Sequence, residues 1–167
     1  MIKVFYSYDF NNDATRVQPI TELNVVRSDK PISREEWKKI KIGGTGTIKK
    51  WIRDNLLFCS CLVVLVGEET ANKPLIKYEI KRAWTDNIAV LGIYIHNLKC
   101  LQKGKSNKGP NPFEQFSQDG IDFSSIVKCY DPDINDPYND INNNIEKWIK
   151  EAIDIRVKYM FSNEYVE

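Results

Sequence analysis

The chain has 167 residues, a length close to that of one ordinary domain, and we expect a single domain over residues 1–167. Hydrophobic residues make up 42% and charged residues 28%, a composition that argues against a disordered, fibrous or membrane-embedded chain. Because 24 Lys and Arg nearly balance 23 Asp and Glu, no long-range field favours nucleic acid or an anionic membrane as partners.

No apolar stretch is long enough to cross a membrane. The longest apolar runs, residues 62–66 and 88–95, fall far short of the roughly 20 residues that span a bilayer, and no secretory signal is visible. We therefore expect a cytoplasmic protein whose four cysteines are free thiols. Cys59 and Cys61 have the wrong spacing for a zinc knuckle, and His96 is the single histidine, so we expect no bound metal.

The first part of the chain predicts a strand followed by a helix. Residues 3–8 are rich in β-branched and aromatic side chains, as strands are. A helix to about residue 23 follows, capped by one of three polar residues, Asn11, Asn12 or Asp13. Residues 24–27 can then form a short second strand.

Two short helices are expected next. Ser33 and Glu36 fit a capping box, in which each side chain bonds to the backbone of the other, and the helix after them contains Trp37. Gly43 and Gly44 end that helix. A further helix begins at Thr45 or Thr47 and places four apolar side chains on one face: Ile48, Trp51, Ile52 and Leu56.

Two buried strands and a helix form the centre of the predicted fold. Residues 61–66 are an unbroken apolar run, typical of a strand covered on both faces, and residues 89–95 form a second. Pro74 suits the first turn of the helix between them. The buried stripe of that helix contains Ile76, Ile80, Ala83 and Trp84.

A long polar loop separates this centre from the last helix. Residues 99–125 are rich in Gly, Pro and Asn, and a loop of this length is usually functional or mobile. Residues 126–130 are expected to be a short final strand, and residues 131–139 a connector. The last helix covers about residues 141–159, with its inward face formed by Ile141, Ile145, Trp148, Ile149 and Ala152.

Strands that alternate with helices predict an α/β fold with a mostly parallel five-stranded sheet of order 2-1-3-4-5. Ligands bind such sheets beyond the carboxyl ends of the strands, where strands one and three diverge. The residues expected there are 7–10, which follow strand one, and 67–73, which follow strand three. Glu79 lies about one and a half turns into the next helix, beside this edge.

Glu79 allows two interpretations from pattern alone. A carboxylate at the rim of a cleft can hold a ribose hydroxyl and oppose the positive charge of an oxocarbenium-like transition state. The alternative is a partly exposed surface residue that pairs with Lys81 or Arg82.

Four segments of the chain carry a resemblance to a known family: YSYDF, IKKWIRDNLLFCSCLVVLVGEETANKPLIKYEIKRAW, LGIYIHN and KSNKGPNPF. Together these segments resemble the Toll/interleukin-1 receptor (TIR)-like proteins of the bacterial Thoeris antiphage system. The resemblance runs from about residue 3 to residue 113 and extends weakly to the last helix. It implies a flavodoxin-like, three-layer TIR sandwich.

The resemblance also implies an activity and a site. Members of this family cleave NAD at the nicotinamide–ribose bond, and similar TIR enzymes place an essential glutamate within a sequence like YEI. Glu79 occupies that position here. NAD is then the substrate, and no further cofactor is implied. The end of strand one would line the nucleotide pocket, with Tyr8 and Phe10 against the base, Ser7 at a phosphate, and Asp9 beside them.

The implied product is a cyclic or conjugated ADP-ribose messenger, made in response to an unidentified phage trigger and read by a separate effector protein. Self-association, or association with other TIR subunits, would complete the pocket. Leu75 stands where the family often has Trp, and the sequence leaves open whether Trp37 reaches the pocket. The other function considered is a TIR or flavodoxin-like interaction module without catalysis.

Overall fold

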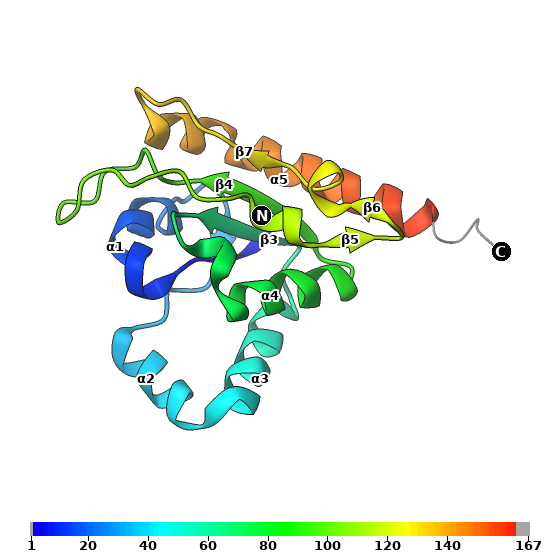
Figure 1. Ribbon diagram of the computed structural model, residues 1–167, viewed down its shortest axis with the longest axis horizontal. Helices are drawn as coiled ribbons and strands as arrows, with labels where there is room; N and C mark the ends of the chain where they lie inside the picture. The colour runs from blue at the N-terminus through cyan, green and yellow to red at the C-terminus, as the bar shows by residue number, and fades with distance from the viewer. Residues whose placement is uncertain (1, 163–167) are drawn as a thin grey trace.

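A parallel five-stranded sheet forms the centre of the molecule in the computed structural model, which describes residues 2–162 (Figure 1). The strands lie in the order β2-β1-β3-β4-β7, and every neighbouring pair runs parallel. Their bounds are Lys3–Ser7 for β1, Arg27–Ser28 for β2, Cys61–Val66 for β3, Ala89–Tyr94 for β4 and Cys129–Tyr130 for β7. The predicted α/β class and strand order are confirmed.

Helices cover both faces of this sheet. Helices α1 (Phe10–Thr21) and α5 (Pro137–Ser162) pack on one face, and α3 (Gly44–Leu56) and α4 (Pro74–Thr85) pack on the other (Figure 1). Successive side chains of a strand point to opposite faces, so Val63 joins the α1–α5 core and Leu62 joins the α3–α4 core. All of β3 is therefore buried, as its apolar sequence predicts.

Several element boundaries differ from the prediction. Asp9, two residues after the end of β1, is the N-cap residue of α1 in place of the predicted Asn11, Asn12 or Asp13, although its side chain makes no capping hydrogen bond. Asp and Asn residues are all good helix caps, so cap preference alone does not determine which of them begins α1. The point at which the chain leaves the sheet determines it. Strand β2 pairs Arg27 with Lys3 and so begins where the predicted strand ends.

Helix α2 (Arg34–Ile42) has the predicted capping box but no buried residue. The Ser33 hydroxyl accepts from the Glu36 N–H at 3.2 Å, and the Ser33 N–H donates to the Glu36 carboxylate at 2.9 Å. Helix α3 starts at Gly44, whose φ of +83° favours glycine, and so begins before both predicted threonines. The two helices meet edge to face through Trp37 and Trp51, with ring centroids 5.8 Å apart.

The long segment between β4 and β7 has structure of its own. It contains two 3-10 turns, η2 (Pro112–Gln115) and η3 (Phe123–Ser125), and a small hairpin of β5 (Ser117–Gln118) and β6 (Ile121–Asp122). A third 3-10 turn, η1 (Thr70–Asn72), follows β3. Phe113 anchors the segment in the core with 0% exposure. The predicted final strand over residues 126–130 shortens to Cys129–Tyr130 because the N–H groups of Ile126 and Val127 bond to the Phe123 carbonyl in the turn that ends η3.

Candidate functional site

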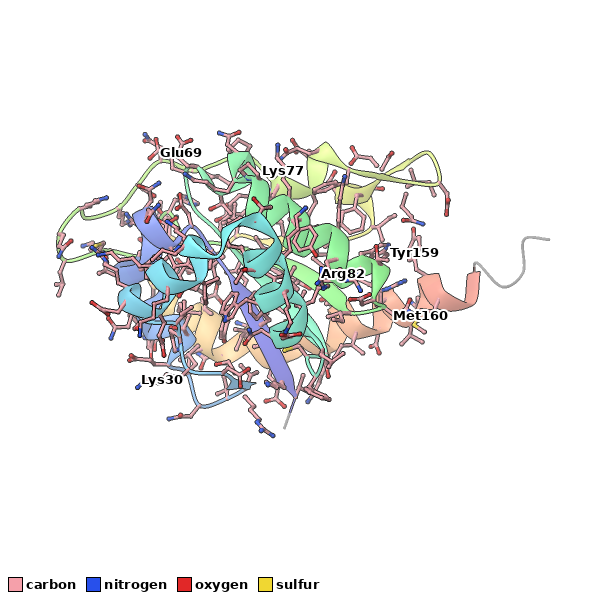
Figure 2. The ribbon with its side chains drawn as sticks, turned by 90° about the horizontal axis from the view of Figure 1, so that it is seen from below. Lys30, Glu69, Lys77, Arg82, Tyr159 and Met160 are labelled. Atoms are coloured by element: carbon pink, nitrogen blue, oxygen red, sulfur yellow. The ribbon has the colours of Figure 1, made fainter. Side chains whose placement is uncertain are left out.

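A cavity of about 230 Å³ opens beside the carboxyl end of β1, at the place where β1 and β3 lead to helices on opposite faces. Its walls come from the end of β1, the segment after β2, and helices α2, α3 and α4. This is the edge at which open α/β sheets bind ligands. Figure 2 views the molecule from this side, with α2 and α3 in cyan and Lys30 at one margin.

Glu79 lies in the wall of this cavity with 8% of its surface exposed. It is a buried member of α4, so the alternative of a surface ion pair is wrong. The hydroxyl of Ser7, at the end of β1, donates a hydrogen bond to the Glu79 carboxylate. Burial raises the pKa of Glu79 from 4.5 to about 7, although the bond from Ser7 opposes this shift. A carboxyl group that titrates near neutral pH is thus held at the ligand-binding edge.

The residues after Ser7 continue the cavity wall. Tyr8 is half-buried, and burial, followed by the nearby Glu79 charge, raises the pKa of its hydroxyl. Asp9 is 4% exposed and accepts from the Asn12 amide at 2.7 Å. Its carboxylate also lies 3.5 Å from the ammonium of Lys73, the residue that precedes α4. Asp9 therefore joins the start of α1 to the start of α4.

The structure brings the predicted site residues together. Glu79, Tyr8, Asp9, Phe10 and Leu75 all line the cavity, and Ser7 contacts Glu79 from the adjacent strand. The bond from Ser7 suggests a role in positioning the carboxylate, in addition to the phosphate contact expected from the sequence.

Two tryptophans belong to the site beyond the residues predicted from the sequence. The sequence predicts Trp51 on the inner face of its helix and does not decide whether Trp37 reaches the pocket; both line the cavity. Lys30, Lys41 and Lys73 bring positive charge to the same wall. The sequence shows that the two tryptophans lie on consecutive helices joined by a glycine turn, but it does not give the angle between those helices.

The described part of the chain holds neither a metal-binding cluster nor a disulfide. Within residues 2–162 no cluster of three or more His, Cys, Asp and Glu side chains is placed to hold a metal ion. All four cysteines there are free. Over the same range, no helix combines the length and hydrophobicity needed to span a bilayer.

A flavodoxin-like sheet with a buried glutamate on the helix after β3 is the arrangement of a TIR-like domain. The family model described as "Thoeris protein ThsB, TIR-like domain" matches residues 5–100, more than half of the chain. The chain therefore belongs to this family.

One curated relative extends the comparison. A protein of Bacillus cereus (strain MSX-D12) named "Putative cyclic ADP-D-ribose synthase ThsB1" is 29% identical over 128 residues. The alignment covers 71% of this chain and 66% of the relative, so the chain spans slightly less than two thirds of the relative's length.

Proposed function

We propose that the protein is an enzyme that cleaves NAD at the nicotinamide–ribose bond and makes a cyclic or conjugated ADP-ribose signal in antiphage defence. The observation that carries this proposal is the Glu79 carboxyl group, buried in a cavity at the ligand-binding edge of the sheet and bonded to Ser7. The name of the Bacillus cereus relative, a cyclic ADP-D-ribose synthase, supports the same substrate and product class.

The proposed reaction breaks the bond between C1′ of the ribose and the ring nitrogen of nicotinamide. The electron pair of this bond leaves with the nicotinamide, whose cationic ring becomes neutral, and positive charge develops on the ribose. The Glu79 carboxylate accepts a hydrogen bond from a ribose hydroxyl and opposes that charge. Water then attacks C1′ and loses a proton to give ADP-ribose. Alternatively, a nitrogen of the adenine attacks C1′, and the adenine, which takes up the positive charge, loses a proton to give a cyclic product.

The surrounding residues suit this reaction. Ser7 fixes the orientation of the carboxylate, and Tyr8 and Phe10 offer aromatic surface beside it. Lys73 and Lys41 bring positive charge to the wall of a cavity that would receive a pyrophosphate. NAD is the substrate, so the proposed chemistry requires no resident cofactor.

The test is mass spectrometry of extracts from phage-infected and uninfected cells that express the wild type, Glu79→Gln or Glu69→Gln. Glu69 is a matched control because it is exposed near the same edge, as Figure 2 shows, and lies outside the cavity wall. We expect infected cells with the wild type or Glu69→Gln to lose NAD and gain nicotinamide and an ADP-ribose derivative. Glu79→Gln should abolish both changes. Equal NAD loss with Glu79→Gln would remove the proposed role of Glu79.

A second candidate function is association without catalysis, and one observation favours it. No residue of α2 is buried, and Ile42 at its end is 86% exposed, so the helix offers apolar surface to a neighbouring subunit. Sedimentation of the wild type and Ile42→Ser tests this. The interaction module replaces the enzyme if Ile42→Ser dissociates an assembly and no infected culture consumes NAD.

A further inference from the structure

Two tryptophans extend the cavity wall away from Glu79. Phe5 lies two residues before Ser7 on β1, about 7 Å back along the strand, with its side chain on the same face. The Trp51 ring packs against Phe5 with centroids 6.0 Å apart, and the Trp37 ring packs against Trp51. The aromatic wall therefore runs from the Glu79 end of the cavity, past Phe5 and Trp51, to Trp37 on α2.

Only the Glu79 end of this path is buried. Glu79 is 8% exposed, whereas Phe5, Trp51 and Trp37 are all half-buried and α2 has no buried residue. The Lys41 ammonium lies 5.6 Å from the centroid of the Trp37 ring. The carboxylate of Asp9 is already occupied by Asn12 and Lys73. Asp29 also lines the cavity, and its carboxylate is paired with Lys3 at 2.9 Å. The cavity thus combines aromatic surface with the positive charge of Lys30 and Lys41, which suits a planar base joined to phosphates.

The volume of the cavity also indicates a ligand that extends toward α2. About 230 Å³ is less than the roughly 300–1,000 Å³ of sites that enclose a drug-sized ligand. A dinucleotide with its reacting ribose at Glu79 therefore extends beyond the enclosed part. Lys41 and Lys73, which line the cavity, would then be the cations available to its pyrophosphate, and α2 the wall available to its second base.

We propose that Trp37 is a specificity-determining residue whose ring binds the adenine base of NAD when the substrate binds, at the outer end of the cavity whose inner end holds the nicotinamide ribose at Glu79. For the cyclic product, the base then leaves Trp37 to reach C1′. This proposal rests on the proposed function for its choice of dinucleotide. The Trp51 ring meets the Trp37 ring in an edge-to-face contact, and the Lys41 ammonium lies over the Trp37 ring, where it can pair with a phosphate of the same ligand.

The test measures the binding of AMP and of nicotinamide mononucleotide by calorimetry. Neither probe requires turnover, so the measurement does not depend on a phage trigger. We expect Trp37→Ala to weaken AMP binding by roughly 5- to 150-fold, the range that base–aromatic stacking supplies, and Trp37→Phe to restore most of it. Binding of nicotinamide mononucleotide should stay within about twofold of the wild type, since stacking at Trp37 serves the other base.

Lys38→Ala is the matched control because Lys38 lies next to Trp37 on the same helix, is exposed, and lies outside the cavity wall. It should bind both probes like the wild type. A thermal unfolding curve checks that Trp37→Ala remains folded, as expected for a residue on a helix with no buried side chain.

Three results would overturn the proposal: AMP binding that Trp37→Ala leaves unchanged, a loss confined to nicotinamide mononucleotide, or a wild type that binds no AMP at millimolar concentration. The proposed NAD cleavage and the proposed adenine site are rejected by different results. If infected cells keep their NAD while Trp37→Ala still loses AMP, the adenine site stands without the cleavage reaction. If NAD is cleaved and Trp37→Ala binds AMP normally, only the adenine site is wrong.

Discussion

Replacing Glu79 with Gln should stabilise the protein, and the gain should depend on pH. The folded protein holds the Glu79 carboxyl group with a pKa of about 7, whereas its ordinary value is 4.5. Between these pH values the folded state binds the proton more tightly than the unfolded state, so the free energy of unfolding falls as pH rises. The interval between 4.5 and about 7, at about 1.36 kcal/mol per pH unit, corresponds to roughly 3 kcal/mol.

The uncharged Gln side chain avoids this cost and can still accept from Ser7. We therefore expect Glu79→Gln to match the wild type below about pH 4.5 and to exceed it by about 3 kcal/mol at pH 8, above both pKa values. For a chain of 167 residues this corresponds to a melting temperature higher by about 6–12 °C.

Urea unfolding followed by tryptophan fluorescence, at steps from pH 4.5 to pH 8, measures this difference. Glu69→Gln removes a carboxylate that is exposed in the fold, and its stability relative to the wild type should change little across the same range. A Glu79→Gln variant that is no more stable than the wild type at pH 8, or whose advantage is constant with pH, would refute the assignment of a buried, destabilised carboxylate.

Three further substitutions test parts of the site and its support. Ser7→Ala removes the hydrogen bond that lowers the pKa of Glu79, so the rising limb of NAD cleavage against pH should move upward by about 1–2 pH units, and an unchanged midpoint would contradict this. Lys73→Gln should raise KM for NAD roughly 2- to 5-fold with a smaller effect on kcat, and steady-state kinetics with equal KM values would exclude a contact with substrate. Gly67→Ala should destabilise the fold by about 1–3 kcal/mol in urea unfolding, because the added Cβ would lie 2.1 Å from the buried Asp13 carboxylate; Gly46→Ala, which meets nothing within 4 Å, is its control.

Local chemistry was enough to predict many elements of this fold. The apolar run of β3, Pro74 at the first turn of α4, and the capping box of Ser33 and Glu36 all occur where the sequence places them. Each of these signals depends on a few consecutive residues. The position of Glu79 on α4 follows from the same local signals, and so does its place near the carboxyl edge of the sheet.

Contacts between distant segments were not predictable in the same way. The bond from Ser7 to Glu79 joins residues 72 apart in sequence and depends on the register that pairs Ser7 with Val64. The ion pair between Asp9 and Lys73 has the same origin. Trp37 reaches the cavity because the turn at Gly43 and Gly44 folds α2 against α3, an angle that neither helix sequence specifies.

Helical periodicity also underestimates how deeply Glu79 is buried. The stripe of Ile76, Ile80 and Ala83 gives the direction of the apolar face, and Glu79 lies at its margin. Helical periodicity treats such a margin as half-exposed. In the folded protein the margin faces the end of β1, where Ser7 supplies the hydrogen-bond donor that a buried carboxylate needs.

The central claim is that a site built around Glu79 cleaves NAD. Measuring NAD and nicotinamide by mass spectrometry in phage-infected cells tests this claim most directly. We predict that cells with the wild type lose NAD, release nicotinamide and accumulate an ADP-ribose derivative, and that cells with folded Glu79→Gln protein at the same level do none of these. If NAD falls equally in both cultures, Glu79 does not carry this chemistry, and if NAD falls in neither culture, the proposed cleavage reaction is wrong.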